Sequence, residues 1–307
     1  MDSANKQIEI QAAPPPATAT HLLALGFTLL CVFPFVLAWD LTRALFTLVG
    51  TNDTFSQIPL IPLVSLFLIY GSRQEIFSDI SFGWISGAAL ITPGMAFVIA
   101  ARLDAGKLSP ANQATVFMFG IVLIWMGAFA FFFGTRAFRA ARIALLFLLF
   151  AVPIPEPLLS KLIAFLQEKS ADAAAAFFSL GRVPYLRRGL VFDLPGVSIQ
   201  VAEECSGIRS TLALFITTAL AGALFLKSNW RRLLLLIVVV PIAIVKNGLR
   251  IATLSTLAIY VNPAFLTGNL HHHGGVLFFL IALVPMALLL IFLERRERAR
   301  PVAAARA

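Results

Sequence analysis

Three residue types that could carry out nucleophilic chemistry stand in separate parts of the chain. Cys205 lies in VAEECSGIR (201–209), Arg250 lies in NGLR (247–250), and His271 opens HHHGG (271–275). A cysteine thiolate is a nucleophile, and histidine can take up and return a proton near neutral pH. A fixed arginine can stabilise the oxyanion of a tetrahedral intermediate or hold the thiolate. Together these groups could support cysteine-dependent acyl transfer.

The apolar stretches around these residues predict that they meet at one membrane surface. Cys205 precedes a predicted span at 207–226, where the helix dipole lowers the pKa of a thiol. Arg250 follows Arg231 by 19 residues, which is about 28 Å of helix and reaches the far edge of the hydrocarbon. His271 comes directly before a predicted span at 275–293. An arginine this deep in an apolar helix suggests a function.

Each residue also has a plainer interpretation. Cys205 could be a small packing residue, and Arg250 could be a snorkelling anchor. The histidines could bind a metal with Glu203 and Glu204 from the other loop, although their own loop has no acidic residue or cysteine. Arg209 is either a second substrate-binding cation or the ion-pair partner of Glu204. The convergence of the three residue types favours catalysis, without a metal or other cofactor.

Composition requires a membrane. The chain has 307 residues, of which 59% are hydrophobic and 13% charged, too few charges to cover a folded surface in water. The net charge of +9 is distributed in clusters at the ends of apolar runs, which argues against nucleic-acid binding. The two cysteines form no disulfide framework, since Cys31 falls in mid-span, and Cys205 is expected to be a free thiol.

The expected fold is an all-α integral membrane protein with about eight transmembrane helices. Continuous apolar runs exclude a β-barrel, whose strands alternate. A polar, disordered cytoplasmic tail at 1–20 precedes a polytopic membrane domain at 21–293, and a basic cytoplasmic tail follows at 294–307. The expected spans lie at about 21–38, 58–71, 82–101, 114–134, an irregular fifth element from 143, 207–226, 231–260 and 275–293.

Two irregular segments interrupt this pattern. Residues 143–152 are apolar but too short to cross alone, and PIPEP (153–157) breaks the helix before an amphipathic stretch. This predicts a broken or tilted span that leads into an interfacial helix. Residues 190–202 alternate and turn at Pro195-Gly196, which predicts a small extracytoplasmic β-hairpin before the sixth span.

Basic clusters set the expected orientation. Arginines at 136, 139 and 142, the cluster 227–232 and the C-terminal arginines belong on the cytoplasmic side. Both termini are then cytoplasmic, and the loops 181–204 and 261–274 face outward. The candidate site therefore lies at the outer face of the cytoplasmic membrane.

The motifs resemble those of the exosortase/archaeosortase family. The resemblance rests on ECSGIR (204–209), NGLR (247–250) and His271-x-x-Gly274-Gly275, with the Pro-rich segment and the hairpin in support, and covers about residues 58–293. It implies a membrane cysteine transpeptidase or protease with Cys205, Arg250 and His271 as catalytic residues. Glu204, Arg209 and Asn247 would support the site or bind substrate. Three consecutive histidines leave the histidine assignment ambiguous.

The resemblance also implies the substrates. They would be membrane-anchored proteins with a C-terminal sorting signal: a short motif such as Pro-Glu-Pro, a transmembrane helix and a basic cluster. The acceptor is not identified. The rival interpretation is a non-enzymatic transporter or scaffold for surface-polysaccharide export, in which Arg209 and Arg250 bind an anionic lipid or sugar phosphate.

Overall fold

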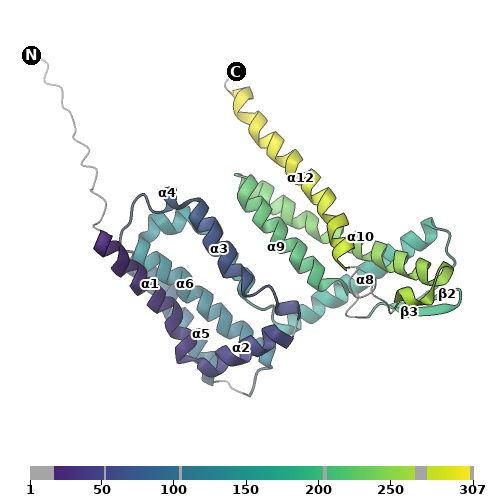
Figure 1. Ribbon diagram of the computed structural model, residues 1–307, viewed down its shortest axis with the longest axis horizontal. Coiled ribbons are helices and arrows are strands. Elements are labelled where there is room, and N and C mark those ends of the chain that lie inside the picture. The colour runs from purple at the N-terminus through teal and green to yellow at the C-terminus, as the bar shows by residue number, and fades with distance from the viewer. Residues whose placement is uncertain (1–16, 52, 104–105, 203–205, 267–274, 305–307) are drawn as a thin grey trace, which may run out of the picture.

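The computed structural model describes residues 17–51, 53–103, 106–202, 206–266 and 275–304, which are mostly helical (Figure 1). The long helices are α1 (Ala17–Leu37), α2 (Trp39–Thr51), α3 (Leu60–Gly71), α5 (Trp84–Leu103), α6 (Pro110–Ala140), α8 (Glu156–Leu180), α9 (Ile208–Phe225), α10 (Asn229–Tyr260) and α12 (Gly275–Ala304). The short elements are α4 (Arg73–Ile76), α7 (Arg142–Phe147), η1 (Asp53–Phe55), η2 (Leu148–Ala151) and η4 (Pro263–Leu266). The strands are β1 (Leu186–Arg188), β2 (Val191–Leu194) and β3 (Val197–Gln200).

The number of membrane spans is five to seven within the described residues. Helices α5, α6, α9, α10 and α12 are each long and apolar enough to cross a bilayer. Two bent pairs add one span each if both halves are counted together: α1 with α2, bent by 86°, and 142–151 with α8, bent by 87°. The stretch predicted at 58–71 forms α3, whose 12 residues rise only about 18 Å. The multi-pass helical fold is confirmed, whereas the predicted count of eight is not.

Close packing of small residues joins α5 and α6 in the N-terminal half. A Cβ atom added to Gly94 would lie 2.9 Å from the carbonyl oxygen of Gly120, and one added to Gly120 would lie 2.7 Å from that of Gly94. Such residues let membrane helices approach until their backbones touch. Helix α6 is therefore the buried centre of this half.

The predicted break in the fifth element is confirmed as a sharp corner. Pro153 and Pro155 separate η2 from α8, because proline offers no amide hydrogen to continue the helix. The backbone amide of Glu156 donates to Oδ1 of Asn112 at 2.8 Å, and the hydroxyl of Ser109 donates to the Glu156 carboxylate. These bonds fasten the corner to the start of α6.

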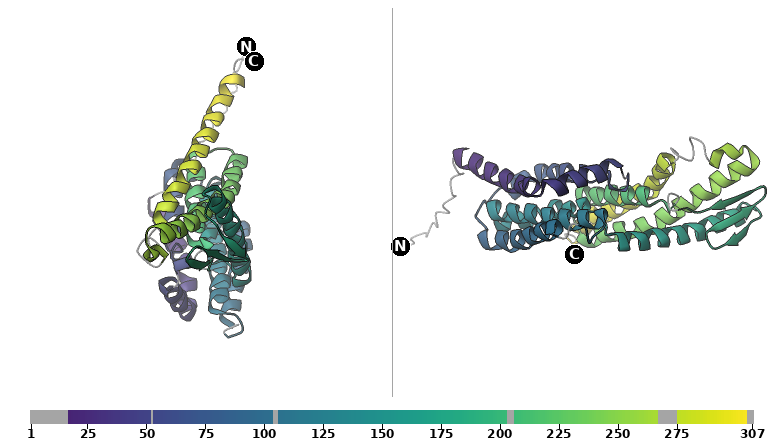
Figure 2. Two further views of the ribbon diagram at one scale, coloured as in Figure 1. Left: turned by 90° about the vertical axis from the view of Figure 1, so that its right-hand side faces the viewer. Right: turned by 90° about the horizontal axis from the view of Figure 1, so that it is seen from below.

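Beyond the corner, α8 and the second half of α10 form an elongated lobe with the sheet (Figure 2). The predicted hairpin is confirmed, since β2 pairs antiparallel with β3 across Pro195-Gly196, and Gly196 has φ 77°. Strand β1, which was not predicted, pairs with the other edge of β2. Phe178 of α8, Phe192 of β2 and Ile251 of α10 belong to one buried cluster, so the lobe has its own apolar core.

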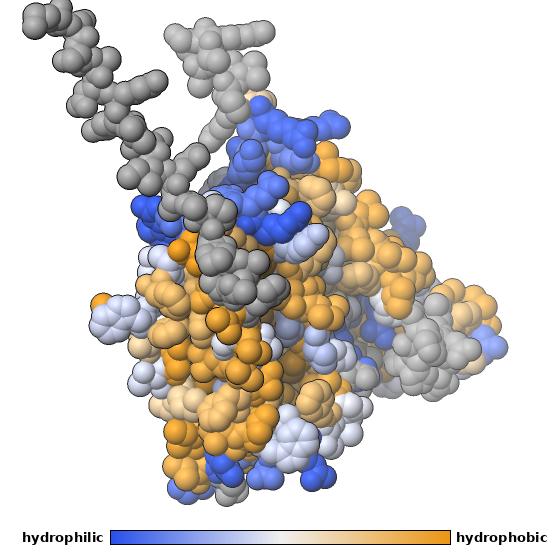
Figure 3. All heavy atoms as spheres, turned by 60° about the vertical axis from the view of Figure 1, so that its left-hand side comes forward, coloured by the Kyte–Doolittle hydropathy of each residue, from blue (hydrophilic) through white to orange (hydrophobic). Residues whose placement is uncertain are grey.

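The surface carries a broad apolar band. Figure 3 shows hydrophobic residues over much of the molecule, with hydrophilic residues gathered towards its ends. Large side chains such as Phe67, Val284 and Leu288 are more than half exposed. A soluble monomer rarely exposes so much apolar surface, whereas lipid tails would cover it. The helix α12 continues past 293 into the basic C-terminal segment.

Candidate active site at the start of helix α9

The segment that follows Cys205 is tightly fixed. Ser206 is 1% exposed, and its Oγ accepts a hydrogen bond from the amide of Ile208 at 3.3 Å. Gly207 precedes α9 with φ 74°, a left-handed conformation that glycine adopts without strain. Its carbonyl oxygen accepts bonds from the amide of Thr211 at 2.9 Å, the Thr211 hydroxyl at 2.8 Å and the Ser210 hydroxyl at 3.0 Å. The sequence after the candidate nucleophile therefore has a defined path.

The NGLR motif lies directly against this segment. A Cβ atom added to Gly207 would lie 2.8 Å from Oδ1 of Asn247, so the motifs of α9 and α10 are in contact. Asn247 is 1% exposed. Gly248 is the point at which α10 crosses α8, because a Cβ atom there would lie 2.5 Å from the Cβ of Ala173. Gly207 therefore allows close contact between the start of α9 and α10, and Gly248 allows close contact between α10 and α8.

A buried lysine adds a second link that sequence analysis missed. Lys246 is 5% exposed, and its Nζ donates to Oγ of Ser210 at 2.5 Å. Because the Ser210 hydroxyl in turn donates to the carbonyl of Gly207, the chain of bonds runs from α10 to the start of α9. The available signal was the lysine itself, since an ionisable residue inside an apolar helix suggests a function.

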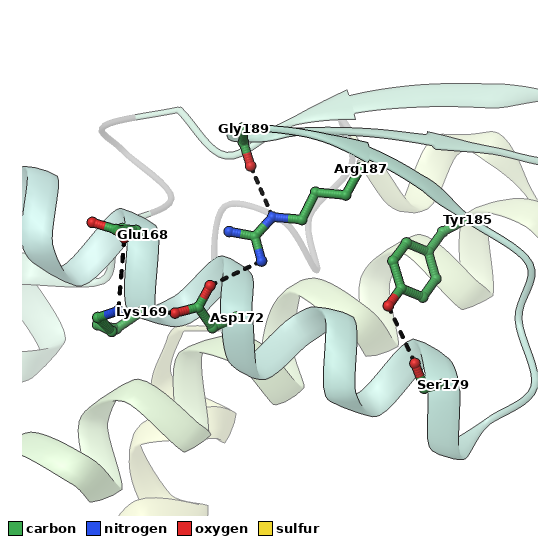
Figure 4. Close-up of polar contacts among 7 residues, drawn as sticks. All are labelled: Glu168, Lys169, Asp172, Ser179, Tyr185, Arg187 and Gly189. Atoms are coloured by element: carbon green, nitrogen blue, oxygen red, sulfur yellow. Dashed lines mark hydrogen bonds and ion pairs between the residues drawn. The ribbon is translucent and has the colours of Figure 1, made fainter.

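Helix α8 holds the segment that precedes residues 203–205. The buried side chain of Gln167 donates from Nε2 to the carbonyl oxygen of Val201 at 2.9 Å, directly after β3. Further along α8, Asp172 accepts from Arg187 of β1 at 2.9 Å, and Ser179 contacts the hydroxyl of Tyr185 at 3.2 Å (Figure 4). The described residues before and after 203–205 are therefore anchored to helices α8 and α9.

The start of α12 belongs to the same neighbourhood. Glu297, late in α12, accepts hydrogen bonds from the backbone amides of Lys227 and Ser228 just after α9, so the two helices run in the same direction and begin on the same side of the molecule. Arg209 is exposed in the first turn of α9, and Arg250 is half-buried one turn beyond Lys246. The structure thus brings together the helices that carry or flank all three motifs. Cys205, Glu204 and His271 themselves lie outside the described residues.

An apolar cavity lies next to this region. Its volume is about 230 Å³, and its walls come from η1, the Pro-rich corner and α9. Leu212, Phe215 and Ile216 of α9 line it, and Leu212 lies about one helical turn after the start of α9 at Ile208. The cavity could accept an apolar side chain.

Metal binding by the histidines 271–273 with Glu203 and Glu204 involves residues outside the described part of the chain. Among the described residues, no group of three or more histidines, cysteines, aspartates or glutamates could hold a metal ion. Glu203, Glu204 and the histidines 271–273 are not among those residues.

Fold and site define a multi-pass membrane protein whose buried polar residues converge near the N-terminus of one apolar helix. The chain belongs to the transmembrane exosortase family (Exosortase_EpsH), whose family model matches residues 49–288. Exosortases are in general cysteine transpeptidases, so the chain has a membrane transpeptidase-type role acting on membrane protein substrates. No curated protein and no solved structure shows a significant match.

Proposed function

We propose that the protein cleaves the C-terminal sorting signals of membrane-anchored proteins at the outer face of the cytoplasmic membrane. The observation that carries this proposal is the contact between Gly207 and Asn247. It joins the motif that contains Cys205 to the motif that contains Arg250. A transporter or scaffold has no need for a thiol two residues before Gly207 in the sequence.

The proposed reaction is acyl transfer through a thioester. The thiolate of Cys205 attacks the scissile carbonyl, and Arg250 stabilises the oxyanion while the S–C bond forms. His271 protonates the leaving amine as the C–N bond breaks. An amine or water then attacks the thioester, its proton passes to the histidine, and the C–S bond breaks to release the Cys205 thiolate. We assign this role to His271 because it stands four residues before Gly275.

Supporting residues would act through position and charge. Asn247, Lys246 and Ser210 hold the two motifs at a fixed separation, as their contacts indicate. Arg209 and Glu204 would contact the substrate close to the nucleophile. The apolar cavity beside α9 would receive a side chain next to the cleaved motif.

The proposed orientation follows from the basic residues. The end of α6, the connection after α9 and the start of α10 carry arginines and a lysine, and Arg231 pairs with Glu297 near the end of α12 at 3.3 Å. This shared end faces the cytoplasm by the positive-inside rule. The basic cluster of a substrate would then stay inside while its motif, such as Pro-Glu-Pro, reaches the outer site.

The decisive experiment compares the two cysteines. A tagged protein that ends in motif, apolar helix and arginine cluster is expressed with the enzyme, and processing is followed by its change in mobility. Cys205→Ser should abolish processing, because the serine hydroxyl is a far weaker nucleophile near neutral pH. Cys31→Ser is the matched control and should process normally. Full processing by Cys205→Ser would rule out the enzyme and favour the transporter or scaffold.

A further inference from the structure

A strongly basic cavity lies at the opposite end of helix α9 from the candidate site. Its volume is about 720 Å³, and it opens where α3, α6 and α9 end and α10 begins. Five cationic side chains and one acidic side chain line it: Arg136, Arg139, Arg142, Lys227, Arg232 and Glu75. The cavity therefore collects positive charge from two separate stretches of the chain, 136–142 and 227–232.

The described part of the chain neutralises little of this charge. Arg136 pairs with Asp79, and Arg232 donates to the carbonyl oxygens of Gly222 and Leu226 at the end of α9. Within the described residues, Arg139, Arg142 and Lys227 form no ion pair. Arg142 lies close enough to Arg232 for their positive charges to repel each other, and Glu297, which pairs with Arg231, offsets only part of this charge. An anion between these groups would relieve that repulsion.

An apolar groove continues from the basic cavity. Its volume is about 300 Å³, and it runs between α7 on one side and α9 and α10 on the other. Ile143, Ala223 and Arg232 line both spaces, so the two are contiguous. Leu146, Phe150 and Ala219 continue the groove along the membrane-spanning part of the molecule. A charged cavity joined to an apolar groove matches a molecule with an anionic head and a hydrocarbon tail.

We propose that this cavity binds the phosphate headgroup of an anionic phospholipid, with one acyl chain in the apolar groove. Arginine forks suit phosphate oxygens, and basic pockets between helices at a membrane surface recognise such headgroups. A soluble phosphate would share the basic cavity but would leave the groove unused. The site is distinct from the proposed transpeptidase site, because it lies at the other end of α9 and α10.

The test measures lipid retention. The full chain is placed in nanodiscs with equal parts of phosphatidylglycerol and phosphatidylcholine, and native mass spectrometry counts the lipids that stay bound on release. Wild type should retain phosphatidylglycerol, and Arg139→Gln/Arg142→Gln should lower its retention roughly tenfold or more, because two cations are lost from the site. Arg43→Gln/Arg295→Gln removes two exposed cations outside both spaces and should retain lipid like wild type.

Two further variants and a phosphate control distinguish a phospholipid from free phosphate and detect misfolding. Ala219→Phe fills the groove and should lower lipid retention, while Arg142→Lys preserves the charge and should keep most of it. Inorganic phosphate added to the lipid-free protein in detergent should raise the Tm much less than phosphatidylglycerol does. An equal rise with phosphate, or equal lipid retention by wild type and the double glutamine variant, would overturn the proposal. Cys205→Ser should bind lipid normally whether or not the proposed chemistry is correct.

Discussion

Gly207 lies so close to Asn247 that a Cβ atom on the glycine would be 2.8 Å from the amide oxygen. The two residues are 40 positions apart and belong to different helical segments. Two features of this position require glycine. Its φ of 74° is left-handed, and the close approach of Asn247 leaves no room for a side chain. The contact sets the separation between the start of α9 and the middle of α10.

Gly207→Ala should therefore reduce processing more than its backbone cost explains. An alanine at positive φ costs about 1–2 kcal/mol, and the Asn247 contact adds to that cost. Gly196→Ala is the matched control, because Gly196 has φ 77° and no neighbouring atom within 4 Å. Processing and Tm are compared for both variants. Equal losses would show that the contact with Asn247 has no importance.

Gly248→Ala should destabilise the crossing of α8 and α10. The added methyl group would lie 2.5 Å from the Cβ of Ala173 and 2.9 Å from the amide nitrogen of Ala174, so backbone must move. Overpacking of this kind costs about 1–3 kcal/mol, which appears as a lower Tm in detergent. Gly222→Ala in α9 serves as the control, since its nearest neighbour is 3.6 Å away. A Tm unchanged by Gly248→Ala would argue against this crossing.

Lys246→Met should reduce processing at least tenfold and leave Tm nearly unchanged. Methionine fills a similar volume but carries no charge and makes no bond to Ser210. Replacing a buried charge with an apolar side chain of similar volume is often neutral for stability. Ser210→Ala instead leaves the buried ammonium without this acceptor. It should lower the free energy of unfolding by about 1–3 kcal/mol, and so should lower Tm more than Lys246→Met does. The double variant should resemble Lys246→Met alone. Normal processing by Lys246→Met would show that Lys246 does not position the two motifs.

Arg250→Lys should not restore activity, although the charge is preserved. A planar guanidinium can hold two oxygens of a tetrahedral centre, whereas an ammonium offers one point charge. The loss of an oxyanion-stabilising donor lowers kcat by roughly 100-fold or more. Arg209→Lys, at an exposed position in the first turn of α9, should keep a substantial fraction of activity. Wild-type processing by Arg250→Lys would reduce that residue to an electrostatic anchor.

Labelling of single cysteines in cells should establish the orientation. Leu186→Cys, at a side chain that is 54% exposed on β1, should react with a membrane-impermeant maleimide in intact cells. Ser78→Cys, an exposed position after α4, should react only after the membrane is broken. Both variants carry Cys31→Ser and Cys205→Ser to remove the two native thiols. The reverse pattern would place the sheet and the candidate site in the cytoplasm.

Sequence patterns predicted the elements that depend on local chemistry. Long apolar runs gave the membrane helices, prolines 153 and 155 gave the break, and the alternation around Pro195-Gly196 gave the hairpin. Each of these signals acts within a few residues, so no knowledge of tertiary packing was needed. The three motifs likewise gave the family, because their residue types and order are specific.

Features that depend on contacts between distant segments were not predicted. The bond from Lys246 to Ser210 joins positions 36 residues apart, and nothing in the pattern of either helix marks its partner. Strand β1 has only three residues and is stabilised by pairing with β2, so its propensity alone is too weak. Helix α2 follows α1 after a bend of 86°, in a stretch to which the sequence analysis assigned no element. The roles of Cys205 and His271 stay predictions.

The length of α10 sets a measure for the substrate. Its 32 residues rise about 48 Å, well beyond a hydrocarbon layer of about 30 Å, so Arg250 stands at a fixed height above the basic residues at its start. Under the proposed function, the helix acts as a molecular ruler. The helical rise between Arg231 and Arg250, about 28 Å, would have to match the distance from a substrate's basic cluster to its scissile bond. A substrate helix that is longer by one turn would overshoot by about 5 Å, and selection among membrane proteins would then depend on length as well as on motif.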